Sequence, residues 1–235
     1  MFSYYGSKSK IVSLYPPPRY DCIIEPFAGS ARYSLKYPEN DVTLLEIDPV
    51  IYGIWYWLIH EATRSDIELL PQLKRGDDLR KMTQLSSVEK DLLGFAVGFG
   101  RSSPGNVVTP RADATGWPKE DSRWRPNNAV DLLKTNILKA LDKVRHWKVF
   151  CKSYCQYKIN RESVWFIDPP YQYSAGRCYT YNQIDYRKLA SYCKTRNGQT
   201  IVCEGNGADW LPFVELKTSH SGSWRTLKEK VWVSV

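Results

Sequence analysis

The sequence predicts an α/β domain with a mostly parallel sheet flanked by helices, interrupted by a small helical insert. Two observations favour this class. At both ends of the chain, short apolar runs that stop at turn or acidic residues alternate with stretches of helical periodicity. Residues 60–147, between these ends, are mostly helical in pattern. We therefore expect residues 1–59 and 148–235 to form one α/β domain and residues 60–147 to form the insert.

The first elements are expected in the order strand, turn, helix, strand. The apolar run 21–27 predicts a buried strand that ends in the small-residue turn 28–31. Residues 32–37 can be helical, and residues 42–46 predict the second strand. This order is typical of the front half of a nucleotide-binding α/β domain.

A helix is expected after the second strand. Asp48 followed by Pro49 is typical of a helix start, with Asp as the N-cap and Pro at the first helical position. Apolar residues at helical spacing continue the pattern as far as Ile59.

The insert is predicted to contain two helical stretches separated by a long loop. The pattern is helical over 66–98 and again over 129–147. Residues 99–128 are rich in Gly, Pro, Arg and Trp and show little periodicity. Loops of this length are usually functional or disordered, and the tryptophans argue against plain disorder.

The α/β pattern resumes after the insert. Strands are predicted at 149–151, 164–167, 199–203 and 230–235. A helix is predicted over 186–195, with Gly198 in the turn that ends it.

Composition and charge narrow the classes of partner. The formal net charge is +8, and a basic surplus favours a polyanionic partner, chiefly nucleic acid. The chain also has 16 Tyr and 9 Trp, which could stack on unpaired bases. No run approaches the ~18 consecutive apolar residues of a membrane span, and the start lacks a signal-peptide pattern. We therefore expect a cytoplasmic protein.

The six cysteines indicate neither a disulfide framework nor a metal site. They form no Cys-x-x-Cys pair and no Cys/His cluster with the spacing of zinc ligands. Several stand in apolar runs and are expected to be reduced core residues. We expect no metal.

The sequence Asp-Pro-Pro-Tyr, directly after the predicted strand 164–167, marks a candidate catalytic site. Its residues are Asp168, Pro169, Pro170 and Tyr171. Proline fixes φ and donates no amide proton, so this backbone keeps free carbonyl oxygens and cannot continue a sheet. A carboxylate, a fixed carbonyl and an aromatic face together suit a flat ring that bears an amine, such as a nucleobase.

Three segments together resemble the Dam-like DNA adenine-N6 methyltransferases (alpha group, D12 class). They are Tyr-Tyr-Gly-Ser-Lys at 4–8, Glu-Pro-Phe-Ala-Gly-Ser-Ala at 25–31 and Asp-Pro-Pro-Tyr at 168–171, in the family's order. The resemblance implies a Rossmann-like methyltransferase core that uses S-adenosylmethionine, with the insert as target-recognition lobe. It also implies a bacterial or phage-infected host cell. The family usually has glycine where Ala31 and Ser7 stand.

The resemblance also implies the cofactor-binding residues. They are Tyr4, Gly6, Lys8, Glu25, Pro26, Phe27, Ala28, Gly29, Ser30, Glu46, Ile47 and Asp168. An acid about 20 residues past a glycine turn can accept hydrogen bonds from ribose hydroxyls. Glu46 and Asp48 compete for this role, and Glu46 is preferred because Asp48 is already explained as an N-cap.

The catalytic hypothesis assigns an acceptor to each proton of the substrate amine. The Asp168 carboxylate accepts one, the Pro169 carbonyl accepts the other, and Tyr171 stacks on the base. A base inside a duplex cannot present its amine in this way, so it is flipped out.

Basic and aromatic residues of two loops are the expected nucleic-acid contacts. They are Arg101, Arg111, Lys119, Arg123, Trp124 and Arg125 in the insert, and Tyr173, Arg177 and Tyr179 after the catalytic motif. Glu204-Gly205-Asn206 resembles a later family motif that faces the same cleft. We expect double-stranded DNA as the partner and favour a monomer.

Alternative functions remain open at this point. Cytosine-N4 and RNA adenine also offer an amine conjugated to a flat ring. Ala31 and Ser7 leave room for an inactive relic that only binds cofactor or DNA. A dehydrogenase is disfavoured because Gly-x-Gly-x-x-Gly is missing.

Overall fold

The computed structural model describes residues 1–98, 101–108, 126–221 and 225–234, and these divide into two compact units. The sheet unit comprises Lys8–Tyr52 and His146–Val235, and the helical unit comprises Met1–Ser7 and Gly53–Arg145. Residues 1–7 and 53–59, which we expected in the α/β domain, group with the helical unit.

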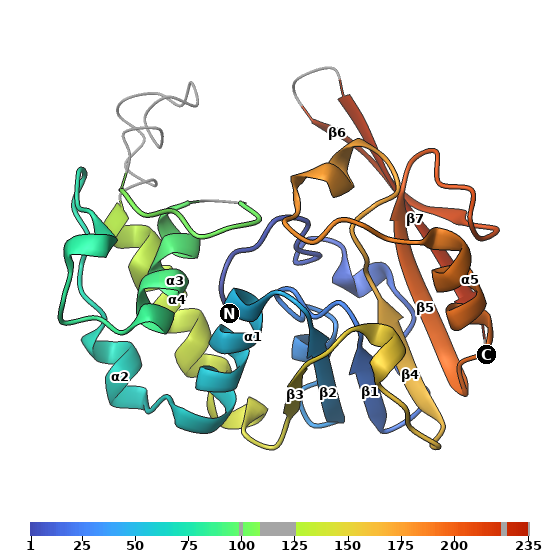
Figure 1. Ribbon diagram of the computed structural model, residues 1–235, viewed down its shortest axis with the longest axis horizontal. Coiled ribbons are helices and arrows are strands. Elements are labelled where there is room, and N and C mark those ends of the chain that lie inside the picture. Colours follow the sequence, from blue (N-terminus) through green and yellow to red (C-terminus); the bar gives the residue numbers. More distant parts are fainter. Residues whose placement is uncertain (99–100, 109–125, 222–224, 235) are drawn as a thin grey trace. The chain divides into compact units, whose positions relative to one another are not determined.

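The sheet unit contains a seven-stranded sheet in the order β3-β2-β1-β4-β5-β7-β6 (Figure 1). The strands are β1 Cys22–Glu25, β2 Asp41–Glu46, β3 Lys148–Cys151, β4 Ser163–Ile167, β5 Gly198–Gly205, β6 Val214–Ser221 and β7 Arg225–Ser234. Neighbouring strands from β3 to β5 are parallel, whereas β7 is antiparallel to both β5 and β6. The sheet is thus mixed but mostly parallel and is flanked by helices, which confirms the α/β class.

The central strands are apolar because both of their faces are covered. β1 and β4 are buried at every position. Helix α5, Tyr186–Lys194, packs Leu189 and Cys193 into a core cluster with Trp165 of β4. Because side chains alternate along a strand, Phe166 faces the other way and stacks on Tyr33 with ring centroids 4.3 Å apart.

In the described residues, three of the other helices begin where the sequence supplies a cap. The other helices are α1 Pro49–Tyr56, α2 Arg64–Leu69, α3 Ser87–Val97 and α4 Pro126–Ala140. The predicted cap at Asp48 is confirmed, since its Oδ1 accepts the Val50 N–H at 2.9 Å. Capping boxes start α2 at Thr63 and α3 at Ser86. After α1 the chain continues as one π turn, Trp57–Glu61.

Several elements differ from the prediction. Only a short 3-10 turn, Ser34–Lys36, forms within 32–37, and α4 ends at Ala140 before another 3-10 turn. Gly198 does not end α5, because Thr195 is the C-cap and Gly198 begins β5 with φ +105°. A Cβ on Gly198 would lie 2.3 Å from the Ser163 carbonyl oxygen, so β4 and β5 approach closely there.

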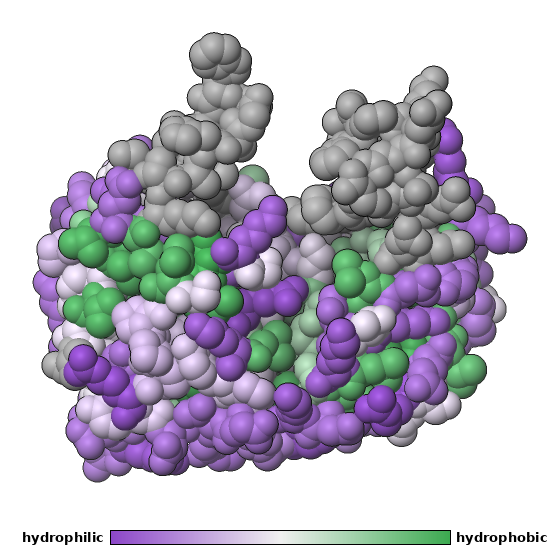
Figure 2. Space-filling view, turned by 180° about the vertical axis from the view of Figure 1, so that it is seen from behind, coloured by the Kyte–Doolittle hydropathy of each residue, from purple (hydrophilic) through white to green (hydrophobic). Residues whose placement is uncertain are grey.

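The outer strands are less completely covered than the central ones. Val214 of β6 is 62% exposed and Val233 of β7 is 38% exposed. Figure 2 shows apolar surface gathered on one face of the sheet unit. The strand β6 was not predicted, because an outer strand needs no continuous apolar run. No described helix is both long and apolar enough to cross a membrane.

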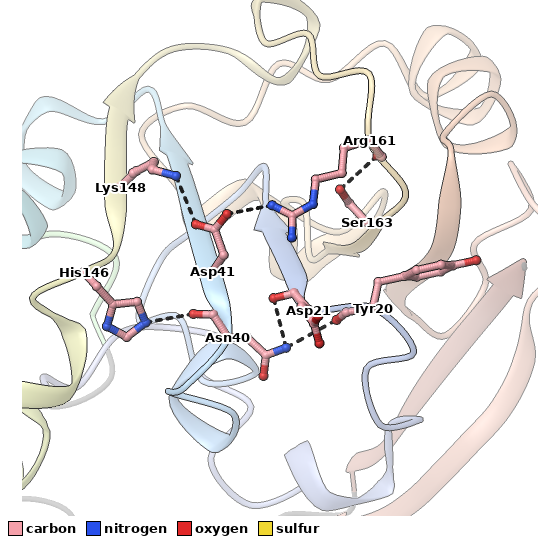
Figure 3. A network of polar contacts seen from close by, with 8 residues as sticks. All are labelled: Tyr20, Asp21, Asn40, Asp41, His146, Lys148, Arg161 and Ser163. Atoms are coloured by element: carbon pink, nitrogen blue, oxygen red, sulfur yellow. Dashed lines mark hydrogen bonds and ion pairs between the residues drawn. The ribbon is translucent and has the colours of Figure 1, made fainter.

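A polar network joins the segments at the amino ends of the parallel strands (Figure 3). Asp41, at the start of β2, accepts from Lys148 at 3.0 Å and from Arg161 at 2.9 Å. The Asn40 side chain donates to the Asp21 carbonyl at 3.1 Å. These groups are largely exposed, so each ion pair contributes only about 0.2–1 kcal/mol. The network lies at the opposite end of the strands from the residues described next.

Candidate functional site

The two sequence motifs of the sheet unit meet where the strand order reverses. β1 pairs with β2 on one side and with β4 on the other. In the pairing of β1 with β4, Ile24 lies opposite Trp165. The turn 26–31 follows β1, and Asp168 follows β4. In open parallel sheets, ligands bind beyond the carboxyl ends of the strands at such a switch point. The fold therefore brings both motifs to the edge where a ligand is expected.

The turn after β1 is tight and has two residues in the left-handed region. Gly29 and Ala31 both have φ +45°, a value that suits glycine but strains an L-residue. The Ala31 N–H donates to the Ala28 carbonyl at 2.7 Å, and the Ala28 N–H donates to the Leu45 carbonyl at 3.1 Å. The turn is thus fixed to β2, and Ala31 occupies a position that favours the glycine usual in the resembling family.

Glu46 ends β2 beside this turn. Its Oε1 accepts the Ile47 and Asp48 N–H groups at 2.8 and 3.0 Å, and its Oε2 accepts the Gly29 N–H at 3.1 Å. Burial raises the pKa of Glu46 to about 7, although these N–H groups act in the opposite direction. Since Oε2 accepts one hydrogen bond, it retains acceptor capacity for a hydroxyl.

Glu25 ends β1 and serves the local structure. Its Oε1 accepts the Ser34 N–H at 2.7 Å, which holds the segment that follows the turn. The side chain is buried, and burial raises the pKa of Glu25 to about 8.

Asp168 is held by a buried lysine. The Lys8 Nζ lies 2.8 Å from Asp168 Oδ1, with exposed fractions of 6% for the lysine side chain and 21% for the aspartate. Burial raises the pKa of Asp168 to about 6, Lys8 opposes this, and Glu229 adds to it. For Lys8, burial alone would lower the pKa, but Asp168 and Glu229 outweigh it and the net shift is upward. Lys8 is therefore a permanent cation.

The Asp-Pro-Pro-Tyr motif presents two adjacent acceptors. In the described part of the chain no donor contacts Asp168 Oδ2 or the Pro169 carbonyl. By contrast, the Pro170 carbonyl accepts the Tyr186 hydroxyl at 2.8 Å. One carboxylate oxygen and one carbonyl oxygen on consecutive residues can accept both protons of a single amine.

Tyr171 is fixed on several sides. Its hydroxyl donates to Glu229 Oε1 at 2.6 Å, and Lys8 Nζ lies 4.7 Å from its ring centroid. A Cβ on Gly205 would lie 2.8 Å from Tyr171 Cδ2, so the glycine makes room for the ring. Stacking of Tyr171 on a base stays a prediction. Lys8 already lies against part of the Tyr171 ring.

Glu204 organises the chain that leaves the motif. It is buried at the end of β5, and its carboxylate accepts the Gln172 N–H at 3.1 Å and the Trp210 indole N–H at 2.9 Å. The Gly205 N–H donates to it at 2.8 Å. The carboxylate thus binds the backbone just after Tyr171, while Asn206 is exposed.

The loop after the motif exposes aromatic and basic side chains. Tyr173 is 48% exposed and Arg177 is also exposed, whereas Tyr179 is half-buried. A Cβ on Gly176 would lie 1.9 Å from the Tyr171 carbonyl oxygen, so the loop folds back tightly on the motif. Contact of these side chains with nucleic acid stays a prediction.

Comparison with known proteins assigns no family. No family model matches the chain, and no curated protein matches it. The described residues also contain no group of three or more His, Cys, Asp or Glu that could hold a metal ion. Function is therefore inferred from the residues and their geometry.

The other predicted residues belong to the helical unit or lie outside the described residues. Tyr4 and Gly6 belong to the helical unit, where Tyr4 makes an edge contact with Phe95 at 5.7 Å. Arg101 is exposed in that unit, and its carbonyl accepts the Tyr5 N–H at 3.0 Å. The other predicted insert contacts, Arg111, Lys119, Arg123, Trp124 and Arg125, lie outside the described residues.

Sequence reasoning missed three members of the cluster around Asp168. Tyr15 donates its hydroxyl to Glu229 Oε1 at 2.6 Å, and the buried Cys203 adjoins Tyr15 and Asp168. None of the three stands in a recognisable motif. One sequence signal could have pointed to Glu229: it is a single acid between two lysines, just before the apolar end of the last strand.

Proposed function

We propose that the protein is a DNA adenine-N6 methyltransferase with a Rossmann-like core that uses S-adenosylmethionine. One observation carries this proposal: Asp168 Oδ2 and the Pro169 carbonyl are adjacent acceptors without a donor among the described residues. They follow β4 at the switch point of the sheet. An exocyclic amine has two N–H groups, and the pair can accept both.

The charge of the strand ends supports a cationic cofactor. Acidic side chains are largely buried there and outnumber the cations, which are the buried Lys8 and the half-buried Arg32; the acids are Glu25, Glu46, Asp168, Glu204 and Glu229. S-adenosylmethionine carries a sulfonium, an ammonium and one carboxylate but no phosphate, so its net positive charge fits this surplus of carboxylates. A dinucleotide would bring its phosphates against them, which disfavours a dehydrogenase.

The residues that would hold the cofactor are those of the turn and its neighbours. The turn 26–30 approaches with backbone and small side chains, Glu46 Oε2 accepts from a ribose hydroxyl, and Ile47 is exposed beside it. When bound, S-adenosylmethionine supplies a methyl group activated by the positive sulfur. The roles of Tyr4, Gly6 and Lys8 toward the cofactor remain part of the proposal.

Catalysis would then consist of orienting the amine. The Asp168 carboxylate and the Pro169 carbonyl draw electron density toward the amine nitrogen and aim its lone pair at the methyl carbon. The cofactor would supply the methyl group: a new N–C bond would replace the S–C bond, whose electron pair would stay on sulfur. The methylated nitrogen releases one proton to solvent, which restores a neutral amine.

Nucleic acid is the proposed substrate because of the net charge of +8 and the exposed aromatic and basic side chains after the motif. Reaching the paired acceptors requires a base outside the helix stack, so base flipping is part of the proposal. Cytosine-N4 and RNA adenine would satisfy the same two acceptors.

The test is methyl transfer from tritium-labelled S-adenosylmethionine to unmethylated duplex DNA, followed by digestion and identification of the labelled nucleoside. N6-methyladenine is expected. Label in N4-methylcytosine, or in RNA alone, would reassign the substrate. A protein that binds the cofactor yet labels none of these nucleic acids would contradict the proposal and support the inactive alternative.

A further inference from the structure

Glu229 contacts three of the groups that surround Asp168. Its Oε1 accepts the hydroxyls of Tyr15 and Tyr171, each at 2.6 Å, and lies 3.7 Å from Lys8 Nζ. The side chain is 16% exposed. Lys8 in turn contacts Asp168 at 2.8 Å. One lysine is therefore shared unequally between two carboxylates, and one carboxylate oxygen holds two tyrosines.

The sheet explains how Glu229 reaches the motif. β7 is antiparallel to β5, and Glu229 is the cross-strand partner of Gly205. Because Gly205 has no side chain, the Tyr171 ring fits against β5 and its hydroxyl can approach Glu229. Glu229 on β7 and Gly205 on β5 together thus fix the position of the Tyr171 side chain.

The charge balance of the cluster involves three ions. Burial raises the pKa of Tyr15, Tyr171 and Cys203, so these groups are neutral at pH 7. The ion pairs in direct contact are then those of Lys8 with Asp168 and with Glu229. The titratable groups facing Asp168 and Glu229 from all neighbouring segments are Lys8, Tyr15, Glu25, Tyr171, Cys203 and Glu204.

We propose that Glu229 is a positioning residue for methyl transfer: it fixes Tyr171 and shares Lys8 with Asp168, which keeps Asp168 a strong acceptor for the substrate amine. This inference rests on the proposed methyltransferase function. Without the Glu229 charge, Lys8 would neutralise Asp168 alone, and Asp168 would accept the amine hydrogen bond more weakly.

Two variants separate the effect of the Glu229 charge from the effect of the length of its side chain. Glu229→Gln keeps an acceptor oxygen at nearly the same place but removes the charge. Glu229→Asp keeps the charge but draws it away from the tyrosines. Asp41→Asn, at the opposite end of the strands, is the matched control for loss of a lysine-paired carboxylate and should leave kcat unchanged. Thermal unfolding of each variant shows whether it folds.

The first measurement is the pH dependence of kcat. In the wild type, kcat should fall as pH drops through about 6, since a protonated Asp168 cannot accept the hydrogen bond. In Glu229→Gln the plateau should fall roughly tenfold or more, with KM for S-adenosylmethionine little changed. Its acid limb should move to lower pH by about one unit, because a like charge has been removed. In Glu229→Asp, kcat should fall at the same acidic pH as in the wild type.

The second measurement needs no activity. The carboxyl carbon of Asp168, assigned by its disappearance in Asp168→Asn, is titrated by carbon-13 NMR in each protein. A downward shift of its titration in Glu229→Gln but not in Asp41→Asn is expected. If that shift occurs while no protein transfers methyl groups, the proposed function fails and the coupling stands. If methyl transfer occurs but neither the titration nor the acid limb moves, Glu229 has no positioning role.

Discussion

At the scale of single residues, the two oxygens of Asp168 have different tasks. Oδ1 pairs with Lys8 at 2.8 Å, and Oδ2 has no donor among the described residues. Replacing one oxygen by an amide nitrogen in Asp168→Asn removes the charge and places a donor where the proposed substrate amine would need an acceptor. We expect kcat to fall by about 10²–10³-fold, a loss usual for one oriented hydrogen bond at the reacting group.

The measurement for this variant is single-turnover methyl transfer, with calorimetric cofactor binding beside it. Binding of S-adenosylmethionine should remain detectable, because the turn and Glu46 are untouched. Turnover in Asp168→Asn at the wild-type rate would exclude the catalytic role of the carboxylate.

Ala31 is the second residue whose conformation makes a prediction. It has φ +45° and is 1% exposed. Ala31→Gly relieves about 1–2 kcal/mol of backbone strain but loses a buried methyl worth about 0.8 kcal/mol and gains freedom in the unfolded chain. The free energy of unfolding should therefore change by less than about 1 kcal/mol.

Ala31→Val is the matched comparison, since a β-branched residue strongly disfavours this conformation and has no space there. It should lower the free energy of unfolding by at least about 2 kcal/mol. Urea denaturation measures both. Equal effects of Gly and Val would show that the left-handed conformation of Ala31 does not constrain the turn.

At the scale of elements, the end of β5 makes room for Tyr171 of the Asp-Pro-Pro-Tyr motif. Gly205→Ala would put a Cβ 2.8 Å from Tyr171 Cδ2. The ring must move, and its hydrogen bond to Glu229 weakens. We expect a loss of about 1–3 kcal/mol in unfolding free energy together with a lower kcat.

Gly53→Ala on α1 is the control with the same chemical change, because a Cβ there meets nothing within 4 Å. It should stabilise the protein by roughly 0.5–1 kcal/mol, the usual gain of alanine over glycine in a helix. Thermal unfolding and methyl transfer of both variants test the pair. Equal behaviour of the two would mean that Tyr171 tolerates displacement.

Sequence patterns predicted those elements whose structure is determined by residues close together in the sequence. β1, β2 and β4 are apolar runs, and Asp48 caps α1 through its own side chain. Gly198 was misassigned because its conformation is set by the close approach of β4, which no neighbouring residue reveals. β6 was missed because an outer strand has no continuous apolar run.

The candidate site divides in the same way. Asp168 and the turn after β1 stand in contiguous motifs and could be found from sequence, and the sheet topology brings their strands together. Tyr15 and Glu229 are more than 200 positions apart, since their hydrogen bond spans 214 residues of chain. Only the completed sheet brings such residues together, so no local spacing could predict them.

At the scale of the whole molecule, the raised carboxyl pKa values predict that binding of the proposed cofactor, S-adenosylmethionine, releases protons. The pKa is about 8 for Glu25, about 7 for Glu46 and about 6 for Asp168, so at pH 7 some of these groups hold protons. A bound cation stabilises the ionised carboxylates, lowers their pKa and expels protons. S-adenosylhomocysteine, whose sulfur is neutral, should expel fewer.

Titration calorimetry at pH 7 in buffers of different ionisation enthalpy measures this release. At pH 9 the carboxyl groups are already ionised in the free protein, so the release should vanish there for both ligands. Equal proton release by the two ligands at pH 7 would show that the positive sulfur does not lie near these carboxylates.

The pairing of β1 with β4 also has a consequence for how the chain folds. The two strands are neighbours in the sheet, yet residues 53–145 of the helical unit lie between them in sequence. Pairing of strands that are distant in sequence closes a long loop, and the entropy lost in closing it is not offset until the strands make contact. Such steps slow folding, and the apolar strands stay exposed in the meantime. The same strand pairing that forms the candidate site should therefore slow folding and leave apolar strands exposed until β4 has joined the sheet.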